Sequence, residues 1–201
     1  MLIARIFVLL WFAAAFTLAL TGWFEQFSSA ALFGFGAIIS ATAFAFLHWV
    51  SENFRGFTRA RSLRRMTQLQ ILRLFGVLAL ILAKEHVLPA LFAIPTAIQD
   101  VFFALTAFHV AASLVTGEGK PERRFFMWHA AGLAGLGLSA LLAVLTSSTR
   151  FGLAWGGITS RPMNQFPQSL VPVFIGPFVL ILHLLALSAA YQHHYSAKIQ
   201  K

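Results

Sequence analysis

The sequence contains no cysteine and only six acidic residues among its 201. Without cysteine, the chain forms no disulfide bonds or thiolate metal sites and has no thiol nucleophile. Five of the six carboxylates lie outside or at the ends of the apolar runs, so few carboxyl groups are available to act as general acids or bases. The sequence also lacks the H-E-x-x-H, G-x-S-x-G and glycine-rich phosphate-loop motifs. These absences argue against an enzyme but leave the question open.

Charged residues of either sign are scarce, and long apolar runs take their place. Only 10% of the residues are charged and 59% are hydrophobic, whereas soluble domains carry roughly 25% charged residues. The apolar runs are about 20 residues long, as a bilayer-spanning helix requires, and do not alternate as the strands of a membrane barrel do. The pattern predicts one all-α integral membrane domain over 1–201, a six-transmembrane-helix bundle with spans at 3–23, 30–50, 67–87, 89–114, 125–146 and 169–191.

The basic residues are distributed unevenly between the predicted loops. Eleven of the fifteen lie on one side of the spans: Arg5, Arg55, Arg59, Arg61, Arg64, Arg65, Lys120, Arg123, Arg124, Lys198 and Lys201. The positive-inside rule then places both termini in the cytoplasm. Because topology accounts for the net charge of +9, no nucleic-acid partner is expected. The first apolar run is nearer about 20 residues than the roughly 7–15 of a signal peptide, so a retained helix is expected.

Two charged residues, Arg73 and Asp100, fall inside predicted spans, where an ionised group costs at least about 2.5–3.5 kcal/mol. If 67–87 and 89–114 form a hairpin around the turn Lys84-Glu85-His86, the two residues lie within roughly 6 Å of each other in depth. Helical spacing places Arg73 on one face of its span, with the other members Gln70, Val77, Leu80 and Lys84. Asp100 shares a face of mostly small residues with Thr96, Ala104 and Ala107.

The Arg73–Asp100 pair, together with the polar residues Gln70 and Gln99, has two interpretations: a structural latch or a functional proton or ligand site. Side chains lean toward the N-terminus of their own helix, which moves Arg73 inward and Asp100 outward. A bridging water, a bridging polar side chain or a protonated Asp100 is therefore expected in place of a direct contact. Pro95, Pro172 and Pro177 interrupt helices close to this depth, and freed carbonyls there could line a cavity.

Four histidines, His48, His109, His129 and His183, fall in the cytoplasmic half of the predicted bilayer. Neutral imidazoles on facing helices can hold a haem axially or bind a transition metal, which makes haem b a candidate cofactor. Each histidine is also explained as an interface or hydrogen-bonded packing residue. No ligand spacing such as H-x-x-x-H supports the metal interpretation.

Several motifs resemble a widespread family of uncharacterised bacterial six-helix integral membrane proteins. They are Arg73-x-x-Gly76, the run Leu88-Pro89-x-x-Phe92-Ala93-x-Pro95 with Asp100, and the stretch PMNQFPQSLVPVFIGPFVLILHLLAL over 162–187. Where such proteins often have Gly-Asp, this chain has Gln99-Asp100. The resemblance covers about half of the chain and implies the bacterial inner membrane without an established activity.

The leading functional hypothesis is a non-catalytic accessory subunit or small-ligand-binding protein of the membrane. Its ligand would be haem, a quinone or another apolar molecule within the helix bundle. The alternative is a small transporter or channel that uses the Arg73/Asp100 region. Beyond the lipid bilayer, the expected partners are a larger membrane complex or further copies of the chain.

Overall fold

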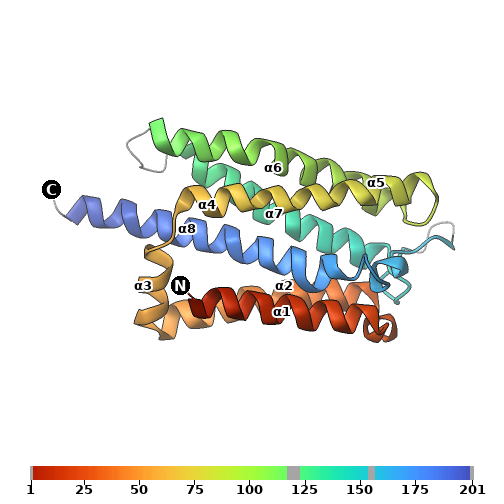
Figure 1. Cartoon of the computed structure of the whole chain (residues 1–201). Helices are drawn as coiled ribbons and strands as arrows, with labels where there is room; N and C mark the ends of the chain where they lie inside the picture. Colours follow the sequence, from red (N-terminus) through yellow and green to blue (C-terminus); the bar gives the residue numbers. More distant parts are fainter. Residues whose placement is uncertain (1, 117–122, 154–156, 200–201) are drawn as a thin grey trace.

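The computed structural model describes residues 2–116, 123–153 and 157–199, and within these ranges every regular element is a helix (Figure 1). The all-α prediction is therefore confirmed. The long helices are α1 (Leu2–Leu20), α2 (Ser29–Val50), α6 (Ala90–Thr116), α7 (Arg123–Leu145) and α8 (Gly176–Ile199). The shorter elements are η1 (Trp23–Gln26), α3 (Glu52–Arg59), α4 (Leu63–Gln68), η2 (Leu69–Gly76), α5 (Val77–Lys84), η4 (Arg161–Asn164) and η5 (Val171–Ile175).

Five helical segments in the described part of the chain are long and apolar enough to cross a bilayer. They are Ser29–Val50, Leu63–Lys84, Ala90–Leu114, Arg123–Leu145 and Val171–Gln192, and each corresponds to a predicted span. The chain is thus a multi-pass membrane protein by helix length and composition. The predicted first span corresponds to α1, whose apolar part Ala4–Leu20 is shorter. At 1.5 Å per residue that part covers about 26 Å of a roughly 30 Å hydrocarbon core.

Serine residues begin three of the helices. The hydroxyl of Ser28 accepts a hydrogen bond from the backbone N–H of Ala31 at the start of α2. Ser51 and Ser62 accept from the N–H groups of Phe54 and Arg65 in the same way, at the starts of α3 and α4. Each cap satisfies one of the amide groups that a first helical turn leaves without a partner. These caps explain the sharp changes of direction on either side of α3.

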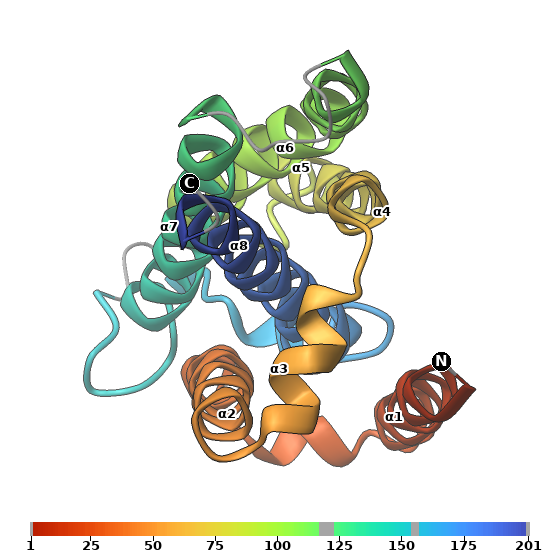
Figure 2. The same cartoon turned by 90° about the vertical axis from the view of Figure 1, so that its left-hand side faces the viewer.

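The helix α8 runs through the middle of the bundle, with α2, α4 and α7 around it, while α1 lies at the edge (Figure 2). Alanine lines its closest contacts, since Ala186, Ala189 and Ala190 are fully buried. On α6, Ala104 and Ala107 are fully buried as well, which confirms the predicted interior face of small residues. Small side chains let helix backbones approach closely in lipid, where the apolar surroundings give no hydrophobic driving force for association.

The third span is a single helical rod of three parts, α4, the 3₁₀ helix η2 and α5. A 3₁₀ helix has three residues per turn, so residues three apart eclipse each other. Gln70 and Arg73, three residues apart within η2, are accordingly both buried. The prediction that this face continues through Val77 and Leu80 is wrong, because these side chains are 38% and 37% exposed. The tighter winding turns the later residues away from the interior.

The hairpin predicted around Lys84-Glu85-His86 is present. The helix α5 ends at Lys84, and α6 begins at Ala90 directly after Pro89. His86 takes a left-handed backbone conformation, with φ at 55°, which reverses the chain. Pro95 lies inside α6 without dividing it into two helices.

The connection between α7 and α8 covers the same end of the bundle as this hairpin (Figure 1). Ser160 anchors it, because its hydroxyl lies 2.6 Å from the hydroxyl of Ser29 and donates to the carbonyl of Ala143 at 3.0 Å. Asn164 donates to the carbonyl of Phe27 just before α2. At the opposite end, α3 crosses the bundle close to where α1 begins and α8 ends.

Candidate functional site

Arg73 and Asp100 form a direct ion pair inside the bundle. The guanidinium Nε of Arg73 donates to Oδ1 of Asp100 at 2.8 Å, and Nη2 lies 2.8 Å from the same oxygen. The side chains are 2% and 15% exposed. The expectation of a bridging group is wrong, because the 3₁₀ winding of η2 turns Arg73 directly toward α6. Pairing offsets part of the large cost of placing two charges in lipid.

Gly76 makes room for the carboxylate. A Cβ atom at this position would lie 2.6 Å from Cβ and 2.7 Å from Oδ2 of Asp100, closer than such atoms approach in proteins. Because Gly76 is three residues after Arg73 in a 3₁₀ helix, it lies on the same face, one turn further along. The Arg73-x-x-Gly76 spacing thus provides both a counterion and a slot for Asp100.

A chain of hydrogen bonds continues from Arg73 away from Asp100. Nη1 of Arg73 donates to the carbonyl of Gly132 at 3.4 Å and lies 3.3 Å from Nε2 of His183. Nδ1 of His183 lies 2.8 Å from Nδ1 of His129, whose Nε2 is 3.1 Å from the hydroxyl of Thr67. Thr67 donates in turn to the carbonyl of Leu63 at 2.9 Å. Four helical segments, η2, α8, α7 and α4, therefore share one polar network.

The two ends of this chain determine the imidazole tautomers. An arginine can only donate, so Nε2 of His183 must accept and its proton must be on Nδ1. That proton goes to Nδ1 of His129, whose own proton must then be on Nε2 and be donated to Thr67. The hydroxyl of Thr67 is free to donate onward to Leu63, and a carbonyl ends the series. Every hydrogen bond therefore points from Arg73 toward Leu63.

Close packing holds this polar network in place. Gly132 of α7 lies against the imidazole of His183, and a Cβ there would collide with that ring. His129 and His183 are both fully buried, with their ring centroids 4.9 Å apart. The guanidinium carbon of Arg73 lies 4.5 Å from the ring centroid of Phe103, in a cation–π contact. The network is thus held by apolar walls on its flanks.

Each of the two predicted glutamines donates a hydrogen bond to another helix. Nε2 of Gln70 donates to the carbonyl of Val179 at 3.4 Å, while its Oε1 has no partner among the described residues. Nε2 of Gln99 donates to the carbonyl of Gly135 at 2.8 Å and to the hydroxyl of Ser139. Gln99 therefore joins α6 to α7 and makes no contact with Arg73. Of the predicted polar set, the structure pairs Arg73 with Asp100 and gives each glutamine a separate packing contact.

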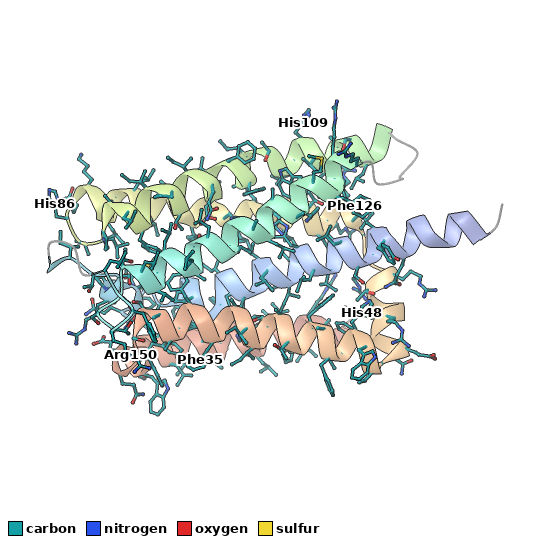
Figure 3. All side chains as sticks on the ribbon, turned by 180° about the vertical axis from the view of Figure 1, so that it is seen from behind. Phe35, His48, His86, His109, Phe126 and Arg150 are labelled. Atoms are coloured by element: carbon teal, nitrogen blue, oxygen red, sulfur yellow. The ribbon has the colours of Figure 1, made fainter. Side chains whose placement is uncertain are left out.

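The four histidines do not form one layer. His129 and His183 contact each other, whereas His109 points outward from α6 and His48 lies on another side of the bundle (Figure 3). Nε2 of His48 is 2.8 Å from the hydroxyl of Ser188 on α8. In the described part of the chain, no three histidine or acidic side chains gather closely enough to hold a metal ion. All four ring nitrogens of the central pair already have hydrogen-bond partners, which favours the packing interpretation over a haem ligand.

A pocket of about 60 Å³ lies beside the ion pair. Its walls come from α2, η2, α6, α7, η5 and α8, and they are apolar except near Asp100. Thr96 and Ser139 add hydroxyl groups to the lining, and Oγ1 of Thr96 is buried without a hydrogen-bond partner among the described residues. The pocket has the composition of a small-ligand site, which is mainly apolar with a few convergent polar groups.

Sequence reasoning missed Thr67 as a member of the network. The signal was present as a repeat of three, Thr67, Gln70, Arg73 and Gly76, in which each residue is polar or glycine. This repeat fits a 3₁₀ helix, but the helical spacing of 3.6 was assumed throughout the span. Thr96 was correctly placed on the face of Asp100 without a site role.

No curated protein and no solved structure matches the chain. Residues 30–191 match a family described as a domain of unknown function, DUF8737, and these residues include all of the spans from α2 to α8 and every group of the polar network. The chain belongs to this family of domains of unknown function.

Proposed function

We propose that the protein is a non-catalytic membrane protein that binds a small ligand in the pocket beside Arg73 and Asp100. The observation that carries the proposal is the combination of an apolar cavity with a buried ion pair and an unpartnered hydroxyl at one end. An ion pair that served only as a structural latch would need no cavity beside it. In this proposal the Arg73–Asp100 pair holds α6 against η2 and also supplies the polar end of the ligand site.

The composition of the site favours binding over catalysis. Asp100 is the only acidic residue in the lining, and its Oδ1 is already engaged by Arg73. General acid–base chemistry needs a group that is free to take or give a proton. A carboxylate held by a guanidinium is better suited to orienting a ligand than to abstracting a proton.

The position of the protein in the cell is part of the same proposal. We place it in the bacterial inner membrane with six spans, α1 included, and with both termini in the cytoplasm. The support is the excess of basic residues at the end of the bundle where α3 crosses, together with the aromatic contacts that α1 makes with the π-helix η5. The ring of Phe174 lies 5.0 Å from Trp11 and 5.1 Å from Phe12.

The proposal is tested by native mass spectrometry of the protein released from lipid nanodiscs, with an absorption spectrum of the same sample. A small bound species is expected in the unsubstituted protein and is expected to be lost on Asp100→Asn. Thr42→Val, on an exposed position of α2, is the matched control and should keep the ligand. If Asp100→Asn lowers only thermal stability and leaves the bound species unchanged, the pair is a latch. A Soret band would instead support haem.

A transporter or channel is the second candidate, and the position of the ion pair favours it. Arg73 and Asp100 lie beside a cavity in the bundle, and the hydrogen bonds of Arg73 continue through His183 and His129 to Thr67. Guanidinium groups keep their protons, so this network does not suit a proton relay. Transport is tested by measuring the uptake of small solutes into liposomes that contain the protein. Uptake that is lost on Asp100→Asn, while this variant stays folded, would establish the function.

A further inference from the structure

We infer that the ligand of this pocket is a small neutral molecule that carries a hydrogen-bond donor, such as an alcohol. The inference rests on the proposed binding function and names the chemical class of its ligand. It follows from which polar atoms of the pocket remain unused and from their shared hydrogen-bonding character.

The first unused atom is Oδ2 of Asp100. Both contacts from Arg73 go to Oδ1, and Asp100 keeps 15% of its side chain exposed where it lines the pocket. An ionised carboxylate oxygen can only accept a hydrogen bond. A ligand that reaches Oδ2 must therefore offer a donor.

The second unused atom is Oγ1 of Thr96, one helical turn before Asp100 on the same face of α6. It is buried and has no hydrogen-bond partner among the described residues. A buried hydroxyl without a partner destabilises the fold. Oγ1 presents no surface to the pocket, so the side chain of Thr96 must rotate about χ1 before a ligand hydroxyl can satisfy it, after which the two hydroxyl groups can donate and accept in turn.

The third group is the carbonyl of Pro172 in the π-helix η5, which also lines the pocket. A π-helix pairs each carbonyl with the N–H five residues later. That residue is Pro177, which has no N–H to give. The carbonyl lies against Gly36 of α2, where a Cβ would collide with it. Its oxygen therefore points toward α2, and Oδ2 of Asp100 is the acceptor that the pocket presents.

The charges that line the pocket favour a ligand with a neutral donor group over a cation. Arg73 and Asp100 together carry no net charge, so a bound ammonium group would leave one positive charge uncompensated in the membrane interior. Such a charge is strongly disfavoured in the hydrocarbon core. A hydroxyl group gains the same acceptors without that cost. The small volume of about 60 Å³ limits the rest of the ligand to a few carbon atoms.

The test uses photoaffinity labelling of the full chain in nanodiscs with three probes that share one diazirine-bearing four-carbon skeleton. The probes end in a hydroxyl, a methyl ether or a primary ammonium group. Labelling of the pocket residues Leu136 and Ile175 is divided by labelling of the lipid-facing residues Phe102 and Leu105, which are 54% and 65% exposed. This ratio corrects for the different partitioning of the probes into lipid.

The alcohol is expected to give a ratio about fivefold above that of the ether, the effect of one net hydrogen bond. Thr96→Val should remove most of this difference, whereas the control Thr42→Val should keep it. Equal ratios above one for alcohol and ether would overturn the donor class and leave ligand binding intact. A higher ratio for the ammonium probe than for the alcohol would show that the pocket binds cations and would overturn the neutral class. Ratios near one for all three probes would contradict the proposed function itself.

Discussion

At the scale of single residues, one guanidinium organises the interior. Arg73 contacts a carboxylate on α6, a carbonyl on α7 and an imidazole on α8, so its removal takes a hydrogen-bond donor away from three helices. Asp100, in contrast, has only Arg73 as a charged partner among the described residues. The two members of the pair are therefore expected to differ in what their loss costs.

Breaking the ion pair on one side should destabilise the fold more than removing both charges. Asp100→Leu leaves the charge of Arg73 buried and is expected to cost about 3–5 kcal/mol, whereas Arg73→Met with Asp100→Leu should recover part of this loss. Reversible unfolding in mixed micelles measures the free energy of unfolding of Asp100→Leu, Arg73→Met and the double variant. The expectation fails if the loss in the double variant equals the sum of the losses in the two single variants.

The tautomers of the histidine pair are a second prediction at this scale. The proton of His183 is expected on Nδ1 and that of His129 on Nε2, because Arg73 can only donate. ¹⁵N NMR of histidine-labelled protein distinguishes the two forms, with Thr67→Val expected to shift the Nε2 signal of His129 most. The opposite tautomer at both rings would show that the direction of the chain is reversed.

At the scale of elements, the 3₁₀ helix η2 is the part that the pattern of apolar residues does not reveal. Its residues are ordinary for a membrane helix, and the repeat of three from Thr67 to Gly76 is a weak local sign of its winding. The α-helices themselves were predictable from apolar runs and serine caps, because these signals are local. The ion pair was predictable in depth along the membrane normal but not in its direct geometry, since the winding of η2 decides which way Arg73 points.

Gly76→Ala tests this geometry. The added Cβ would lie 2.6 Å from Cβ of Asp100, and the strain is expected to cost about 1–3 kcal/mol. Gly34→Ala is the matched control, because nothing lies within 4 Å of a Cβ at that position of α2. The control should be neutral or more stable by about 1 kcal/mol, as alanine favours a helix. Thermal unfolding of both variants is the measurement, and equal stability would contradict the slot for Asp100.

At the scale of the whole molecule, the bundle has two chemically different ends. Arginine-rich segments, including α3 and the start of α4, lie at one end, and the α5–α6 hairpin with the α7–α8 connection lies at the other (Figure 1). Composition alone predicted this asymmetry, because the number of charges on each side of a span can be counted directly. The neighbours of each helix could not be predicted, since apolar faces in lipid carry little information on which helices pack together.

The absence of cysteine makes the orientation directly testable. Single cysteines at Ala60 and at Glu85, both exposed, report the two ends of the bundle. In intact cells a membrane-impermeant thiol reagent is expected to label Glu85→Cys and to label Ala60→Cys only after the cells are opened. The cysteine-free protein is the blank. The reverse labelling pattern would place the arginine-rich end outside.

The one-way hydrogen-bond series has a consequence for how the interior responds to change. Each link accepts on one side and donates on the other, so no single link can invert without setting two donors or two acceptors against each other. Arg73 can only donate, and it therefore sets the direction of every hydrogen bond in the series. His183, His129 and Thr67 behave as one cooperative unit, whose internal dipole always points from the pocket toward the arginine-rich end.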